Sequence, residues 1–119
     1  MFDWNQFFVL AQELSLRDDD ASKRTAISRA YYAVFHRARR LVVMEGAQLS
    51  RHGLVHDEVW DIFDACAGPR RTVARLGRLL RAARRSADYQ GGMDAIVRET
   101  EQAMARAQTA MTLLDTKVR

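Results

Sequence analysis

The chain has few of the residues that cross-link, interrupt or loosen a fold. Its 119 residues include one cysteine and one proline. A single cysteine excludes an intrachain disulfide, and Cys66, close to Phe63 and Ala65, is expected to be a small apolar filler in a reducing compartment. With one proline and no low-complexity stretch there is no sign of a linker. We therefore expect a single domain over residues 1–119.

Long hydrophobic runs are also missing. No apolar run approaches the roughly 20 residues that a helix needs to cross a bilayer. The first residues, MFDWNQFF, carry an acid where a secretory signal would carry basic residues. Apolar residues still make up 48% of the chain, which is typical of a folded protein. These features predict a cytoplasmic protein without membrane association.

Lysine is scarce among the cations. The chain has 19 basic and 15 acidic residues, and only Lys23 and Lys117 are lysines. A guanidinium group forks onto phosphate and stacks on bases, so a surface dominated by arginine suits nucleic acid. A GC-rich genome would raise the arginine content equally well. The placement of the arginines is therefore more informative than their number.

Five segments space their apolar residues three and four positions apart, and none alternates as a strand would. They run from Asp3 to Ser15, from the acids 18–20 to near Gly46, from Val55 to Cys66, from Pro69 to about residue 90, and from Met93 to Val118. The acids can cap the second helix, Gly46 can end it, and Pro69 can begin the fourth. Long helices with short connections predict an all-α, antiparallel up-and-down bundle.

Each segment has one apolar stripe that we expect to face the core. The stripes are Trp4, Phe7, Phe8, Ala11 and Leu14; Ile27, Tyr31, Val34, Ala38, Leu41 and Val42; Val55, Val59, Ile62 and Cys66; Val73, Leu76, Leu80, Ala83 and Ala87; and Met93, Val97, Thr100, Met104, Ala107, Met111, Leu114 and Val118. The last series alternates steps of three and four throughout, as a bundle seam does.

The fourth segment carries a face of arginine opposite its apolar stripe. Residues 70–90 contain seven positive charges and one negative charge. Like charges at helical spacing repel, and a phosphate backbone or an acidic partner would relieve that repulsion. A solvated face that pairs with neighbouring acids would explain the pattern equally well. The residues taken as candidates for binding RNA are Arg78, Arg81, Arg84 and Arg85.

The single acid of this segment, Asp88, stands in the last turn, where a negative charge opposes the helix dipole. It lies one turn from Arg84 and Arg85, so it could orient an arginine at a functional site or form a plain ion pair. Tyr89 follows it and is a further candidate for binding RNA.

The second segment has another stripe behind its core face, which includes Ser28, Tyr32, His36 and Val43 with Arg39 or Arg40. A tyrosine and a histidine one turn apart could line a cleft or a dimer seam, and His36 could move a proton near neutral pH. The alternative is that Tyr32 packs on another helix and His36 lies in a polar pocket.

Two motifs in this order resemble a known family. Residues 28–36, SRAYYAVFH, resemble the signature helix of short stand-alone HEPN proteins. A histidine and a run ending in phenylalanine follow, here His56 to Phe63, and Arg84 or Arg85 begins a segment similar to the family's Arg-x-x-Ala-Asp-Tyr. The resemblance covers roughly residues 20–115. It implies a helical bundle that often forms a homodimer, and in many members a role in toxin–antitoxin or defence systems.

For catalytic members the resemblance implies cleavage of RNA without a metal, by an Arg and a His that four to six residues separate. The histidine would help to activate the 2′-hydroxyl or would protonate the leaving oxygen, and the arginine would neutralise the charge of the phosphate. The late helix here has no histidine, which departs from that pattern. Arg29 and His36 match the spacing, as do Arg51 and His56, but about one such match is expected by chance among so many arginines.

Two functions therefore stay open. The first is a dimeric HEPN-type protein that engages RNA, with Arg29, His36 and Asp88 as candidate catalytic residues and Tyr32 among the residues that bind RNA. The second is a protein-interaction module that pairs with a nucleotidyltransferase or an antitoxin. We expect no cofactor, and His52 and His56 lack the further ligands of a metal site.

Overall fold

A computed structural model of the chain describes residues 1–50, 53–92 and 95–116. Every regular element in these ranges is a helix, which confirms the predicted all-α fold. The helices are α1 (Asn5–Ser15), α2 (Asp20–Met44), α3 (Val55–Asp64), α4 (Pro69–Tyr89) and α5 (Ile96–Thr116). None of them combines the length and apolar character that a bilayer crossing needs.

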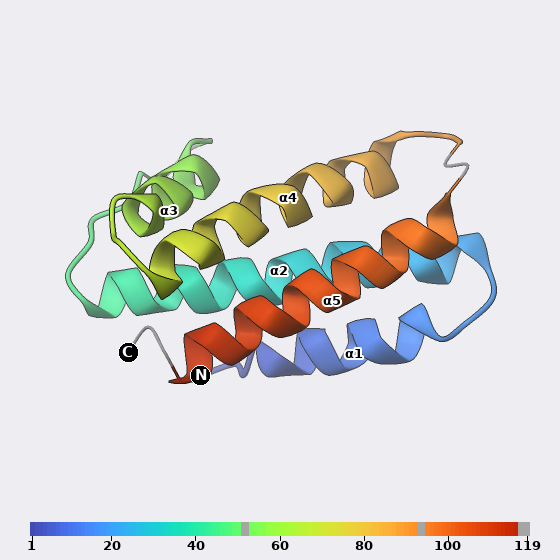
Figure 1. Ribbon diagram of the computed structural model, residues 1–119, viewed down its shortest axis with the longest axis horizontal. Coiled ribbons are helices and arrows are strands. Elements are labelled where there is room, and N and C mark those ends of the chain that lie inside the picture. The colour runs from blue at the N-terminus through green and yellow to red at the C-terminus, as the bar shows by residue number, and fades with distance from the viewer. Residues whose placement is uncertain (51–52, 93–94, 117–119) are drawn as a thin grey trace.

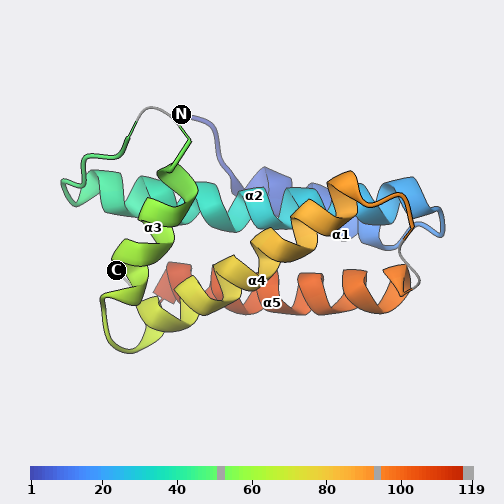
Figure 2. The ribbon, with the colours of Figure 1, turned by 90° about the horizontal axis from the view of Figure 1, so that it is seen from above.

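The four longer helices form an antiparallel bundle around α2. Figure 1 shows α1, α2, α4 and α5 running alternately in opposite directions along the long axis of the molecule. Helix α2 contacts each of the other four helices. The short α3 runs crosswise at one end, between the end of α2 and the start of α4 (Figure 2). The first turn of α3 therefore lies beside α2.

The predicted helix boundaries of α2 and α4 have clear causes. The Asp19 side chain accepts a hydrogen bond from the Ser22 backbone N–H at 2.8 Å and caps α2. Gly46 follows the helix with a φ of +101°, a conformation that favours glycine after a helix end. Pro69 is the first residue of α4, as predicted, because a proline there loses no helical hydrogen bond.

The end of α4 is fixed by an arginine of α2. The Arg24 Nη1 group donates to the carbonyl oxygen of Ala87 at 2.9 Å and to that of Gln90, and Nη2 donates to that of Gly91 at 3.3 Å. A cation at the carbonyl end of a helix satisfies its free acceptors and complements its dipole. Asp20 holds the same guanidinium group through Nε at 3.0 Å.

The core combines the predicted stripes with a few residues that spacing did not indicate. Leu41 and Ala83 are half-buried, and Trp60 of α3 is fully buried although it was not in the predicted stripe. Helix α3 ends at Asp64, so Cys66 lies in the turn after it and the predicted register over Val55–Cys66 is too long. The chain needs that turn to reverse direction before α4.

The predicted seam of α5 is wrong at its beginning. Val97 is 54% exposed, because Ile96 rather than Val97 lies on the face that continues through Thr100. Met93 and Val118 of the predicted seam lie outside the described residues. The buried positions of α5 are Thr100, Ala103, Ala107, Ala110, Met111 and Leu114. Three alanines on this face let α5 pack closely against its neighbours.

Candidate functional site between helices α2, α3 and α4

His36 lies on the side of α2 that faces the first residues of the chain. Its ring stacks on the indole of Trp4, with centroids 3.7 Å apart and planes inclined by 12°. Tyr32, one turn earlier, stacks on His36 at 5.9 Å. Burial lowers the pKa of His36 below its ordinary value, and the nearby Arg39 adds to this effect. The histidine is therefore neutral at pH 7 and half-buried.

A second histidine, His56, lies beside the same helix from the first turn of α3. Its ring stacks on Phe35 at a centroid distance of 3.9 Å and an interplanar angle of 12°. Its Nδ1 atom forms a 2.5 Å hydrogen bond with the Tyr31 hydroxyl group. Tyr31 is fully buried and also receives a hydrogen bond at 3.3 Å from Trp60 Nε1.

The two histidines share an aromatic base. The Tyr32 ring lies 5.9 Å from His36 and 6.2 Å from His56, and the Phe35 ring lies 5.2 Å from His36 and 3.9 Å from His56. We call these four residues together with Tyr31 the histidine cluster. The cluster joins side chains from two helices, so it depends on the packing of α3 against α2.

The electrostatics of the cluster keep both imidazoles neutral. Burial, together with the positive charges of Arg81 and Arg84, lowers the pKa of His56 to about 4. Burial raises the pKa of the Tyr31 hydroxyl group to about 12. At pH 7 both histidines can therefore accept or donate hydrogen bonds without carrying a charge.

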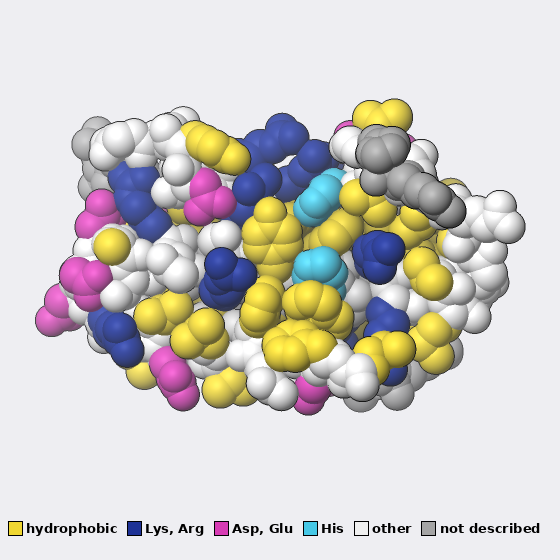
Figure 3. All heavy atoms as spheres, turned by 180° about the vertical axis from the view of Figure 1, so that it is seen from behind, with side chains coloured by type: hydrophobic (Ala, Val, Ile, Leu, Met, Phe, Trp, Pro, Cys, Tyr) yellow, Lys and Arg dark blue, Asp and Glu magenta, His cyan; other side chains and the backbone are white. Residues whose placement is uncertain are grey.

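Two arginines of α4 flank the histidine cluster. The Arg84 guanidinium carbon lies 5.5 Å from the centroid of the Tyr32 ring, and Arg84 Nη1 lies 3.2 Å from Asp88 Oδ2. Arg81 Nη1 pairs with Asp57 Oδ1 at 2.7 Å. In Figure 3 the two described histidine side chains lie amid hydrophobic side chains, with a group of Lys and Arg side chains next to one of them.

The structure brings together five of the nine candidate residues. Arg84 lies over Tyr32 and pairs with Asp88, and Tyr32 in turn stacks on His36. Arg81 pairs with Asp57, the residue that follows His56, and so lies next to the same cluster. Asp88 and His36 are thus connected through two intervening side chains.

The other four candidates lie apart from the histidine cluster or reach it indirectly. Arg29 lies over the Phe7 ring at 5.0 Å, and Phe7 contacts Trp4, the stacking partner of His36. Arg78 pairs with two acids near the end of α3. Arg85 and Tyr89 are exposed, and neither has a bonded partner within the described part of the chain.

Acids neutralise much of the arginine face of α4. Arg78 pairs with Asp61 at 2.6 Å and with Asp64 at 3.3 Å, in addition to the pairs that Arg81 and Arg84 form. Arg75 has no acidic partner among the described residues. The pairs reduce the self-repulsion of the face, and a phosphate would have to compete with these carboxylates for the arginines.

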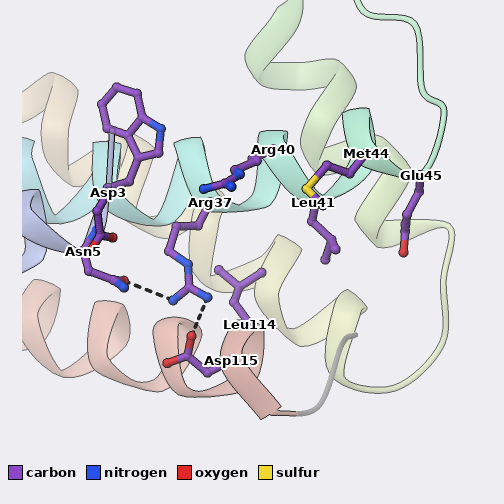
Figure 4. Close-up of a pocket in the computed structure, with 10 residues that line it drawn as sticks. Asp3, Asn5, Arg37, Arg40, Leu41, Met44, Glu45, Leu114 and Asp115 are labelled. Carbon is purple, nitrogen blue, oxygen red and sulfur yellow. Dashed lines mark hydrogen bonds and ion pairs between the residues drawn. The ribbon is translucent and has the colours of Figure 1, made fainter. Parts of the chain in front are cut away.

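The larger cavities lie elsewhere. One of about 570 Å³ opens between the N-terminal segment, α2 and the end of α5, where Arg37 bonds Asn5 at 3.2 Å and pairs with Asp115 (Figure 4). These contacts tie three segments together. Another of about 580 Å³ lies beside the start of α4, near Arg71, Arg75 and Arg78. No residue of the histidine cluster lines either of these cavities.

His56 is a site residue that the sequence does not single out. Its spacing matches Arg51 and His52, and both of these residues lie outside the described part of the chain. The available signal was the position of His56 four residues before Trp60, which puts both side chains on one face of α3. Among the described residues no group of three His, Cys, Asp or Glu side chains could hold a metal ion.

Comparison of the chain with protein-family models, with curated proteins and with solved structures finds no match. The resemblance to HEPN proteins therefore depends on the two sequence motifs alone.

Proposed function

We propose that the chain is a HEPN-type protein that engages RNA at the histidine cluster, in the cytoplasm and as a homodimer. The observation that supports this most directly is the pair of neutral, half-buried histidines beside Arg84, on an aromatic base that could stack a nucleobase. Imidazole, guanidinium and aromatic rings are the groups that RNA binding and RNA cleavage both need.

In the catalytic form of the proposal, the RNA supplies its own nucleophile. His36 takes the proton of a 2′-hydroxyl, the 2′-oxygen forms a bond to phosphorus, and the bond from phosphorus to the 5′-oxygen breaks. The same proton passes from His36 to that leaving oxygen, which gives a 2′,3′-cyclic phosphate and a 5′-hydroxyl end. Arg84 stabilises the charge that develops on the phosphate, and Asp88 orients it.

The test is incubation of the purified protein with end-labelled single-stranded RNA in excess chelator. We expect cleavage that leaves 2′,3′-cyclic phosphate ends, and a loss of about 10²–10⁴-fold in rate in His36→Ala, as for removal of an acid–base residue. Salt-sensitive binding without cleavage would support a non-catalytic relative. Absence of both binding and cleavage would overturn the proposal.

A second candidate function is supported by exposed apolar side chains at the end of α2 and just before the start of α3. Val43, Met44 and Leu54 are 44%, 72% and 61% exposed, close in sequence to the ends of α2 and α3. Exposed apolar side chains of this kind mark surfaces that bind proteins. We propose, as the alternative, a module that pairs with a nucleotidyltransferase or an antitoxin. Co-purification with the product of an adjacent gene, together with a lack of RNA binding, would favour it.

A further inference from the structure

Three buried or half-buried polar groups form a chain of hydrogen bonds beneath the histidine cluster. Trp60 Nε1 lies 3.3 Å from the Tyr31 hydroxyl oxygen, and that hydroxyl group lies 2.5 Å from His56 Nδ1. Trp60 and Tyr31 are both fully buried. Water therefore cannot replace either partner, and the direction of each hydrogen bond is set by the groups themselves.

The direction follows from the kinds of groups involved. An indole N–H can only donate, so the Tyr31 oxygen accepts from Trp60. If His56 also donated to that oxygen, the hydroxyl hydrogen of Tyr31 would be buried without an acceptor among the described residues, at a cost of about 1–3 kcal/mol. Tyr31 instead donates to His56 Nδ1, which must then be the unprotonated nitrogen of the neutral ring.

The other ring nitrogen of His56 is directed to the outside. Nε2 has no hydrogen-bond partner in the described part of the chain. Among the described residues, the buried side-chain nitrogen and oxygen atoms that lack a partner are the Nε atoms of Arg81 and Arg84, and His56 Nε2 is not one of them. This nitrogen is therefore in contact with solvent, and the charges of Arg81 and Arg84 act on the ring to which it belongs.

We infer that Tyr31, oriented by Trp60, is a positioning residue that fixes His56 with its proton on Nε2, so that His56 presents an N–H donor to an anionic oxygen. The inference depends on the proposed function, because it assigns different roles to the two histidines at the same site. His56 donates a hydrogen bond to a phosphate oxygen without being charged, and His36 is the imidazole that accepts the proton.

Several charged and titratable groups face His56. They are Tyr31, Tyr32 and His36 on α2, Asp57 on α3, and Arg81 and Arg84 on α4. The arginines and burial both disfavour an imidazolium ion, and Asp57 alone favours it. The balance keeps the ring neutral at pH 7, which is the state in which the Tyr31 hydrogen bond selects the tautomer.

The wild-type protein provides the first test. Two-bond ¹H–¹⁵N correlation spectra distinguish a protonated from an unprotonated ring nitrogen in each histidine. We expect an unprotonated Nδ1 and a protonated Nε2 for His56 at pH about 7, and the same assignment with an altered Nε2–H shift when inorganic phosphate is added. A protonated Nδ1 would overturn the inference. A response to phosphate in which the Nε2–H shift of His56 does not change would overturn it as well.

Removal of the hydroxyl group provides the second test. In Tyr31→Phe the neutral form of His56 loses its hydrogen bond, so its pKa should rise and both tautomers should be populated. Tyr32→Phe is the matched control for the spectra, because the Tyr32 hydroxyl group forms no hydrogen bond to a described residue. An unchanged tautomer and pKa in a folded Tyr31→Phe would contradict the role of Tyr31.

The two proposals fail in different ways. An Nδ1–H tautomer in a protein that still binds or cleaves RNA would remove the positioning role and leave the proposed function in place. The expected tautomer in a protein that neither binds nor cleaves RNA would overturn the proposed function, and the donor role of His56 toward phosphate would then depend on the inorganic phosphate titration alone.

Discussion

Gly77 of α4 lies directly against the indole ring of Trp60 of α3. A Cβ atom on Gly77 would come within 2.5 Å of Cη2, 2.6 Å of Cζ2 and 2.7 Å of Cζ3 of that ring. Both residues are buried, and Trp60 also donates to Tyr31. The glycine thus allows α3 to approach α4 closely enough for the hydrogen-bonded chain beneath the histidine cluster to form.

Gly77→Ala should destabilise the protein. Alanine gains about 1 kcal/mol in helix propensity, but overpacking a buried site costs about 1–3 kcal/mol, and the fully buried indole ring has no free space into which to move. We expect a lower midpoint in urea denaturation and an altered tautomer balance of His56. Gly91→Ala is the control, because a Cβ there meets nothing within 4 Å. Equal stability of both variants would contradict the close packing.

The helix boundaries could be predicted from the sequence, but the contacts between helices could not, because the two depend on interactions of different range. Caps and breaks act locally, so Asp19, Gly46 and Pro69 could be identified from their neighbours alone. The contact of Gly77 with Trp60 depends on how two helices cross, which helical spacing does not specify. The error at Val97 has the same origin, because a strict alternation of three and four leaves the exact face of a helix undetermined by about one residue.

The candidate site was predictable only in part for the same reason. Tyr32 and His36 lie one turn apart on α2, so their shared stripe was visible in the sequence. His56 joins them through a contact with Tyr31 across 25 positions of sequence, and nothing local indicates which helix face α3 will meet. Arg84 and Asp88 form an i,i+4 pair, which spacing does predict.

Arg24→Lys should loosen the end of α4. The guanidinium group reaches three carbonyl oxygens near Ala87 and Gly91 and is held by Asp20, and a single ammonium group cannot reproduce this geometry. We expect a loss of about 1–3 kcal/mol and faster hydrogen exchange in the last turn of α4. Arg17→Lys, an exposed position outside this network, should change neither quantity. Unchanged exchange in Arg24→Lys would show that the helix end is held by other contacts.

Acidification should destabilise the protein over the histidine range. The pKa of His56 is about 4 when folded and near its ordinary value of 6.5 when unfolded, and that of His36 is also lowered. As pH falls below about 6.5, the histidines of the unfolded chain take up protons before those of the folded chain. The contribution of the neutral histidines to the free energy of unfolding is therefore fully present above that pH and is lost as the pH falls toward about 4. Urea denaturation at pH about 7 and about 5 measures the change.

A substitution separates this effect from that of the acids. In His56→Asn the amide oxygen can still accept from Tyr31, but the side chain does not titrate, so the decline over this range should become shallower. The lowered pKa values of Asp19 and Glu58 act only below about 4.5, which is outside most of the histidine range. A pH profile unchanged by the substitution would mean that His56 titrates normally.

The position of a charge, and not only its sign, should matter for RNA. Arg84→Gln and Arg98→Gln each lower the formal net charge of +4 by one, but only Arg84 lies at the histidine cluster. Loss of one phosphate contact should reduce the slope of log affinity against log salt by about 0.7 for single-stranded RNA. We expect this in Arg84→Gln alone, measured by fluorescence anisotropy. Equal slopes in both variants would indicate that the basic surface binds RNA without a defined site.

Trp4 should control the protonation of His36. Its indole stacks on the imidazole at 3.7 Å, and burial is the main cause of the lowered pKa of His36. Trp4→Ala uncovers the ring, so the pKa of His36 should rise toward its ordinary value, because a solvated imidazolium ion is no longer disfavoured. An NMR titration of His36 measures the shift, and Trp4→Phe should preserve most of the cover. If Trp4→Ala leaves the pKa unchanged, the first residues of the chain do not shield the proposed base, and the pH dependence of any RNA cleavage should then be insensitive to them as well.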